Sequence, residues 1–99
     1  MDQNPIIVVP LSNGFKASNQ PTNKHSDLIF DALALSIDSQ FLEEYEKLMA
    51  HLQSDSYSRV LVVSPDQLDA FPDQYNVVPT LDEARDFIEM ERIERDLGF

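Results

Sequence analysis

The chain has 99 residues, and its eighteen acidic side chains against seven basic ones give it a net charge of -11 at pH 7. A surface this negative repels phosphate backbones and anionic headgroups over a Debye length of about 8–10 Å, so we expect binding neither to nucleic acid nor to a membrane. The sequence contains no cysteine, which excludes disulfides, thiolate nucleophiles and sulfur ligands for a metal.

The first part of the chain predicts a short strand followed by a long loop. Residues 6–9 are β-branched and lie between two prolines, a pattern that favours a strand that ends early. Residues 12–26 are mostly polar, and only Phe15 and Ala17 interrupt them. We therefore expect a flexible loop over residues 12–26.

The next stretch predicts a second strand and an amphipathic helix. Residues 28–37 alternate as a strand does but are rich in Ala and Leu as a helix is, and we favour a strand that begins near Leu28. Asp38 and Ser39 then offer a helix N-cap, and apolar residues follow at steps of one, three and four. We expect a helix over residues 38–53.

Residues 59–63 have the clearest strand pattern in the chain, and a short helix is expected after them. Ser64 would cap this helix, a proline occupies its first position, and Gln67 would complete a capping box. Pro72 limits the helix to residues 65–71. The apolar residues expected to face the core are Leu68 and Phe71.

The last two elements are predicted to be a strand over residues 75–78 and a helix over residues 80–97. Thr80 and Glu83 have the capping-box spacing at the start of the helix, and Gly98 ends it. Its apolar residues form a stripe that drifts slightly around the helix. They are Leu81, Ala84, Phe87, Ile88, Met90, Ile93 and Leu97.

The order of these elements predicts an α/β fold. Strands that alternate with helices form a mostly parallel sheet, here of about four strands, with helices at 38–53, 65–71 and 80–97 packed against it. At this length the whole chain, residues 1–99, should form a single domain.

The chemistry of the side chains does not predict an enzyme. His25 and His51 lack the spacing of a zinc site, and the two glycines are too few and too far apart for a phosphate-binding loop. The acidic pairs lie in the opening turns of predicted helices, where carboxylates are common without catalysis. We therefore expect no catalytic, cofactor-binding or metal-binding residue, and no cofactor.

Asp38 and Ser39 are the exception, because they lie between a predicted strand and a helix N-terminus. A phosphate on Ser39 would be stabilised there by the helix dipole, which makes the pair a candidate phosphorylation or contact site. The simpler interpretation, which we favour, is that both residues only cap the helix.

From residue 33 onward the motifs follow a recognisable order. Their sequences are Ile37-Asp38-Ser39-Gln40, Val60-Leu61-Val62-Val63, Ser64-Pro65-Asp66-Gln67-Leu68 and Pro79-Thr80-Leu81-Asp82-Glu83-Ala84. This order resembles the second half of STAS domains, the fold of bacterial anti-sigma factor antagonists. In those proteins an Asp-Ser-Ser-Gly turn opens a helix, and a Val-rich strand, a Ser-Pro-led helix, a strand and a Thr-Leu-x-Glu-Ala helix follow. Gln40 and Phe41 stand where the family has Ser and Gly, and residues 1–32 are short for its first half, so the resemblance implies a truncated STAS-like domain.

The resemblance implies a non-enzymatic protein–protein interaction module that acts in regulation. Because the N-terminus lacks a secretion signal and no apolar run is long enough to span a membrane, we expect a cytoplasmic protein with a cytoplasmic protein partner. The final helix is the candidate partner-binding element. Its candidate contact residues are Phe87, Met90, Ile93 and Leu97.

Two alternatives remain open. Residues 89–99 are similar to the ending of small bacterial STAS-like proteins encoded beside ribonuclease Z, which would make the chain an accessory subunit of that enzyme in RNA processing. It cannot itself be ribonuclease Z, because it lacks the His-x-His-x-Asp-His metal motif. A weaker alternative is a small-molecule sensor whose site lies at the carboxyl ends of the strands, near residues 36–39 and Ser64.

Overall fold

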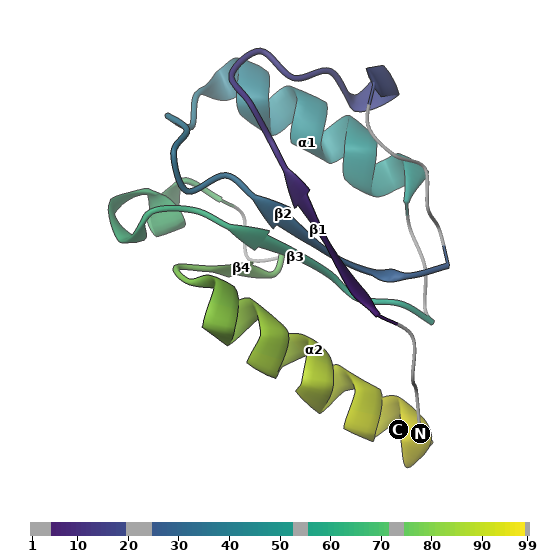
Figure 1. The fold of residues 1–99 in the computed structure, drawn as a ribbon. Helices are drawn as coiled ribbons and strands as arrows, with labels where there is room; N and C mark the ends of the chain where they lie inside the picture. The colour runs from purple at the N-terminus through teal and green to yellow at the C-terminus, as the bar shows by residue number, and fades with distance from the viewer. Residues whose placement is uncertain (1–4, 20–24, 53–55, 72–74, 99) are drawn as a thin grey trace.

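The computed structural model describes residues 5–19, 25–52, 56–71 and 75–98, and within them a four-stranded parallel sheet forms the centre of the fold (Figure 1). The strands lie in the order β1-β2-β3-β4, so each one pairs with the next along the chain. The predicted α/β class and parallel sheet are confirmed. The strands are β1 (Ile6–Pro10), β2 (Asp27–Asp31), β3 (Arg59–Val62) and β4 (Val77–Val78).

The two α-helices cover opposite faces of this sheet (Figure 1). Helix α1 (Ser39–His51) lies on one face together with two 3₁₀ helices, η1 (Ala17–Asn19) and η2 (Pro65–Ala70). Helix α2 (Leu81–Asp96) lies on the other face. The predicted helices at 38–53 and 80–97 are therefore confirmed, with ends that differ by one or two residues.

Alternation within the central strands supplies both cores. Leu28 and Phe30 of β2 point into the core under α1, whereas Ile29 between them points towards α2. In β3, Leu61 belongs to the α1 side and Val60 to the α2 side. Because both faces are covered, these strands are apolar at every position except the charged residues at their ends, instead of alternating with polar residues.

The ambiguous stretch 28–37 is a strand only in its first part. β2 ends at Asp31, whose carboxylate accepts a hydrogen bond from the Leu33 N–H at 3.1 Å, and the Leu35 N–H donates to the Ala32 carbonyl at 3.1 Å. The Ala and Leu residues that suggested a helix therefore form a turn. The hydrogen bond from the Leu33 N–H to the Asp31 carboxylate favours this turn, because such local side-chain bonds compete with helix and strand formation.

The short helix predicted at 65–71 is present as the 3₁₀ helix η2 over Pro65–Ala70, but its predicted capping box is wrong. Within the described residues 56–71, Ser64 makes no side-chain cap bond. The Gln67 side chain reaches across to the turn before α1, where it accepts from the Ile37 N–H at 2.6 Å and donates to the Leu35 carbonyl at 2.7 Å. Phe71 is buried and Leu68 is half-buried, as predicted, and Pro72 lies outside the described residues.

The segment predicted as a flexible loop is attached to α1 in its first half. Phe15 is buried, and the Ala17 N–H donates to the Glu44 carboxylate at 2.9 Å, where η1 forms. These two apolar residues of the segment are therefore its anchors. Residues 20–24 lie outside the described part, and the flexibility of 12–26 stays a prediction.

Helix α2 begins and ends where its caps predict. The Thr80 hydroxyl accepts from the Glu83 N–H at 3.1 Å, which is the first bond of the predicted capping box. At the other end Gly98 has a φ of +80°, and its N–H donates to the Arg95 carbonyl. No helix within the described ranges is both long and apolar enough to span a membrane.

Candidate functional site

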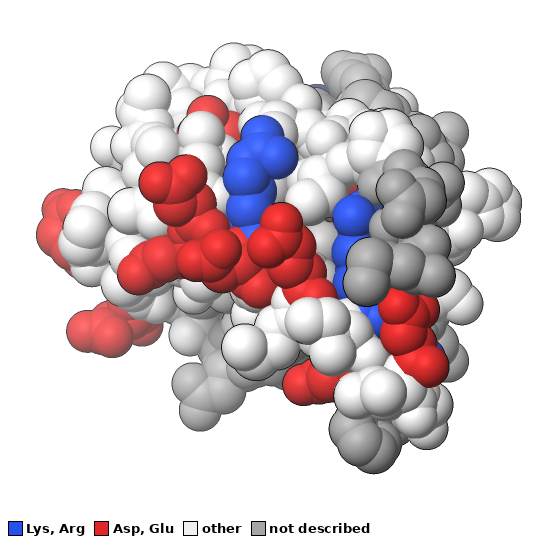
Figure 2. Space-filling model, turned by 60° about the horizontal axis from the view of Figure 1, so that its bottom comes forward, with Lys and Arg blue, Asp and Glu red and all other residues white. Residues whose placement is uncertain are grey.

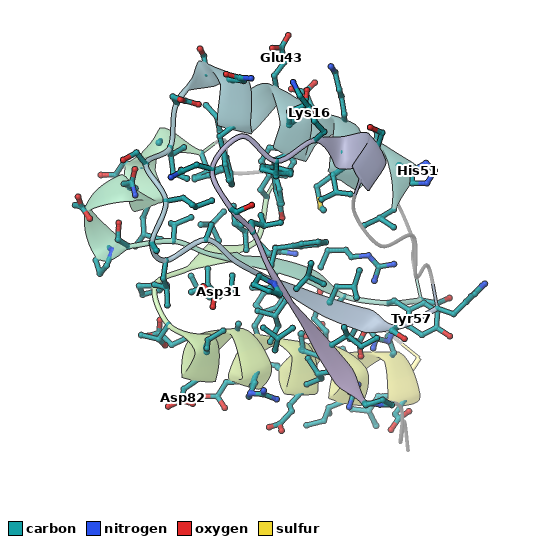
Figure 3. The ribbon with its side chains drawn as sticks, turned by 45° about the horizontal axis from the view of Figure 1, so that its top comes forward. Lys16, Asp31, Glu43, His51, Tyr57 and Asp82 are labelled. Carbon is teal, nitrogen blue, oxygen red and sulfur yellow. The ribbon has the colours of Figure 1, made fainter. Side chains whose placement is uncertain are left out.

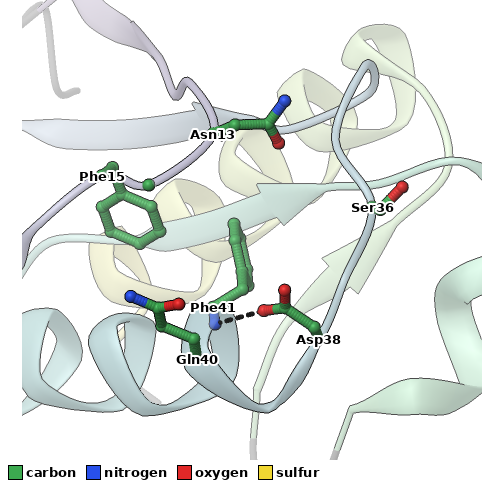
Figure 4. Close-up of a pocket in the computed structure, with 7 residues that line it drawn as sticks. Asn13, Phe15, Ser36, Asp38, Gln40 and Phe41 are labelled. Carbon is green, nitrogen blue, oxygen red and sulfur yellow. Dashed lines mark hydrogen bonds between the residues drawn. The ribbon is translucent and has the colours of Figure 1, made fainter.

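A small pocket opens beside the N-terminus of α1, at the carboxyl ends of the strands (Figure 4). Its volume is about 230 Å³. Its lining residues come from the loop after β1 and from the segment that enters α1. They are Asn13, Gly14, Phe15, Ser36, Asp38, Gln40 and Phe41. The pocket includes Ser36 and Asp38 of the weaker small-molecule alternative but not Ser64, and the strand order has no reversal of the kind that forms a ligand crevice in open α/β sheets.

Asp38 and Ser39 have different roles at this edge. The Asp38 carboxylate accepts from the Phe41 N–H at 2.8 Å, so it is the N-cap of α1 (Figure 4). Ser39 is the first residue of the helix and is exposed. Because the carboxylate already satisfies one N-terminal N–H, a phosphate on Ser39 would meet a negative neighbour as well as the helix dipole. Phosphorylation of Ser39 stays a prediction.

Phe41, in the first turn of α1, contributes its side chain to the core. Its ring is buried and lies 5.1 Å from the Phe15 ring, 6.1 Å from the Tyr45 ring and 6.2 Å from the Phe71 ring, measured between centroids. The buried rings of Phe15 and Phe41 therefore line the pocket on its inner side.

A second groove runs between η1 and α1, and its lining contains three of the chain's basic groups. The groove has a volume of about 630 Å³ and is lined by Lys16, Ala17, Ser18, Glu44, Lys47 and His51. The Glu44 carboxylate contacts Lys47 at 3.3 Å. The bond from the Ala17 N–H lowers the pKa of Glu44 below its ordinary value, and Lys47 adds to this effect against the opposing effect of burial.

The predicted partner-binding residues of α2 do not all share a face. Phe87 is half-buried against the sheet, whereas Met90, Ile93 and Leu97 are 64%, 55% and 63% exposed. Within the described residues four large apolar side chains are exposed, and the three most exposed belong to this helix and its C-cap; the fourth, Leu33, is 39% exposed. Figure 2 shows the surface of this side of the molecule, where acidic side chains surround uncharged patches.

A buried carboxylate holds α2 in this orientation. Asp27 is fully buried at the start of β2 and accepts from Arg92 Nε at 2.7 Å and from Arg95 Nη2 at 3.3 Å. It also accepts from the Ser58 N–H at 2.6 Å, and Arg95 Nη1 donates to the Ser58 hydroxyl at 3.0 Å. We call Asp27, Ser58, Arg92 and Arg95 the Asp27 network.

Sequence reasoning missed the Asp27 network, although two signals for it were present. An aspartate directly precedes a run of buried apolar residues, and two arginines lie three residues apart in an acidic helix. A charge next to a buried strand needs a partner of opposite charge, and arginines at that spacing share one face of a helix. Asp27 is 65 residues from Arg92 and 68 residues from Arg95, so the sequence pattern does not indicate that these side chains pair.

The histidines do not identify a metal site. Within the described residues, no three or more His, Asp or Glu side chains gather in a way that could hold a metal ion. The His25 ring contacts the Tyr57 ring with centroids 6.1 Å apart, and His51 is exposed at the end of α1 near Lys16 (Figure 3). No family model, curated protein or solved structure matches the chain significantly. The function must therefore be argued from these surfaces.

Proposed function

We propose that this chain is a non-enzymatic protein–protein interaction module of the STAS, anti-sigma factor antagonist-like type, and that it binds a cytoplasmic protein in a regulatory role. One observation carries the proposal: Met90, Ile93 and Leu97 project from a helix that the Asp27 network holds firmly to the sheet. Apolar side chains gathered on one exposed face are typical of a protein interface.

The parallel fold and the Asp38 cap support the family assignment within this proposal. Asp38 caps a helix directly after the turn that follows a strand, which is the place of the Asp in the family's Asp-Ser-Ser-Gly turn. The Ser64-Pro65 segment and the Thr80-led helix follow in the expected order.

The composition of the pocket supports a binding role over catalysis. Among the described residues that line it, Asp38 is the one ionisable side chain, and its carboxylate is already engaged with the Phe41 N–H. General acid–base chemistry usually needs a positioned group whose pKa is tuned by its neighbours. Among its described lining residues there is no second titratable side chain to act as such a neighbour.

Affinity capture from a native lysate tests the proposal. The wild-type chain, the double variant Met90→Gln/Ile93→Gln and the control Leu33→Gln are used as baits side by side. Leu33 is the matched control because it is the remaining exposed large apolar residue in the described part and belongs to the turn after β2, not to α2. We expect a specific protein with the wild type and with Leu33→Gln, and its loss with the double variant. The proposal fails if no specific protein is retained at several salt concentrations.

The second candidate is an accessory subunit of ribonuclease Z in RNA processing. One observation favours it: the stretch that carries that resemblance, residues 89–99, includes the exposed apolar residues Met90, Ile93 and Leu97. Mixing this chain with ribonuclease Z should then produce co-migration in gel filtration and a changed processing rate. If neither changes, this candidate is eliminated.

A further inference from the structure

The outward side of α2 combines an apolar stripe with an acidic rim. Met90, Ile93 and Leu97 are spaced by three and four residues, so they lie along one side of the helix over about 10 Å. Exposed carboxylates flank this apolar stripe, and others lie between it and the start of the helix. They belong to Asp82, Glu83, Asp86, Glu89, Glu94 and Asp96.

The Asp27 network makes this side more acidic than the sequence of the helix suggests. Helix α2, described throughout, contains three basic residues, Arg85, Arg92 and Arg95. The guanidinium groups of Arg92 and Arg95 point inwards and donate to the carboxylate of Asp27. Arg85 is thus the only exposed cation of the helix. Figure 2 shows the resulting concentration of acidic side chains.

We infer that this face docks a cationic amphipathic helix of the partner protein. The inference rests on the proposed function and adds the chemistry of the partner. Leucine-like side chains of such a helix would cover Met90, Ile93 and Leu97, and its Lys or Arg residues would contact the acidic rim. This is helix-to-helix recognition with complementary charge, in which the apolar anchors provide affinity and the rim provides orientation and speed of association.

Charge complementarity argues against the two other occupants of this face. A second copy would bring two acidic rims together, with a net charge of -11 on each chain. Like charges facing each other across an interface are destabilising. An anionic membrane would meet the same repulsion, so a cationic segment of another protein is the occupant that the surface favours.

A designed peptide tests the inference. The probe is a fluorescein-labelled Lys–Leu peptide of about 18 residues whose leucines recur with the helical period, which gives a helix of roughly 27 Å. Two controls have the same length: a scrambled peptide of identical composition, and a Glu–Leu peptide with the same pattern. Binding is measured by fluorescence anisotropy at low and high salt.

We expect the patterned Lys–Leu peptide to bind at least about tenfold more tightly than either control, and more weakly at high salt. Met90→Gln/Ile93→Gln should weaken binding about tenfold or more, whereas Leu33→Gln should leave it unchanged. Glu89→Gln/Glu94→Gln should weaken it at low salt alone. The matched charge control is Glu43→Gln/Glu46→Gln, on the exposed side of α1.

Several results would overturn the inference. The first is that the scrambled peptide binds as tightly as the patterned Lys–Leu peptide. The second is that Glu43→Gln/Glu46→Gln weakens binding as much as Glu89→Gln/Glu94→Gln does. The third is that Met90→Gln/Ile93→Gln leaves the affinity unchanged. A wild-type dimer in sedimentation that dissociates in Ile93→Gln would assign the face to a second copy, and binding to phosphatidylglycerol vesicles that this variant abolishes would assign it to a membrane. If affinity capture yields a partner whose binding survives Met90→Gln/Ile93→Gln, the interaction module stands and the docking face is wrong.

Discussion

Removing the carboxylate of Asp27 should destabilise the protein more than any surface substitution, because Asp27 connects α2 to the central sheet. Its side chain is fully buried and accepts from Arg92, from Arg95 and from the Ser58 N–H. In Asp27→Ala the Ser58 N–H loses this acceptor, and the guanidinium groups of Arg92 and Arg95 lose the buried carboxylate that accepts from both.

The magnitude follows from the burial of the three partners. Breaking a buried ion pair by removing one member costs about 3–5 kcal/mol, because the other charge is left uncompensated. The Arg92 and Arg95 side chains remain 15% and 25% exposed, so water can partly solvate them, and we expect a value near the lower end. A chain of this length has a free energy of unfolding of about 5–15 kcal/mol, so a loss of ~3 kcal/mol is a large share of it.

Urea unfolding followed by circular dichroism measures this loss. With a slope of about 1.5 kcal/mol per M, the midpoint for Asp27→Ala should fall by ~2 M relative to wild type. Asp86→Ala is the matched control, since Asp86 is an exposed carboxylate on the same helix, and it should change the free energy of unfolding by less than about 0.5 kcal/mol. Amide exchange in residues 92–97 should also accelerate in Asp27→Ala.

A loss below about 1 kcal/mol for Asp27→Ala, or one equal to that of Asp86→Ala, would refute the reasoning. A double-mutant cycle with Arg92→Met separates the ion pair from the backbone bond. We expect a coupling energy of about 1–3 kcal/mol between Asp27 and Arg92, because the two side chains are in direct contact at 2.7 Å. Additive effects of the two substitutions would show that the carboxylate stabilises the fold through Arg95 and the Ser58 N–H and not through Arg92.

Three further predictions follow from burial, hydrogen bonding and titration. Ile88→Ala should lower the free energy of unfolding by about 2–5 kcal/mol, and Ile93→Ala by less than about 1 kcal/mol, because Ile88 is fully buried and Ile93 is 55% exposed; equal losses in urea unfolding would contradict the orientation of α2. Gln67→Glu places an oxygen opposite the Leu35 carbonyl and should cost about 2 kcal/mol, with faster proteolysis in residues 33–38; wild-type proteolysis rates would count against this bridge. Because the pKa of Glu44 is lowered in the folded state from its ordinary value of 4.5, its carboxylate contributes stability that is complete above that value and is lost as the pH falls through the lowered pKa. Glu44→Gln should therefore be less stable than wild type at pH 7 and equal to it at strongly acidic pH, and a difference that persists in acid would contradict the assignment.

Local pattern was sufficient to predict most of the elements. The signals for β3 and for α2 lie in residues close together in the sequence: an apolar run for β3, and the Thr80 cap with an apolar stripe for α2. The predicted boundaries of both elements are confirmed to within one or two residues. Local pattern also predicted the short helix after β3, but the capping box that the Ser64-Gln67 spacing suggested is wrong. Gln67 instead bonds to the segment before α1, about 30 residues away in the chain, and local spacing contains no information about such a partner.

For the candidate site, the sequence by itself determined that α2 carries more apolar residues than one buried face requires, because helical periodicity depends only on neighbours along the chain. Only the tertiary structure decided which of them point outwards. The strands in contact with Ala84 and Ile88, and the buried carboxylate of Asp27 at the far end, set the rotation of the helix, and this rotation leaves Met90, Ile93 and Leu97 exposed while Phe87 packs against the sheet. Contacts between residues about 65 positions apart exist only after the chain has folded, which is why the sequence pattern could not reveal them.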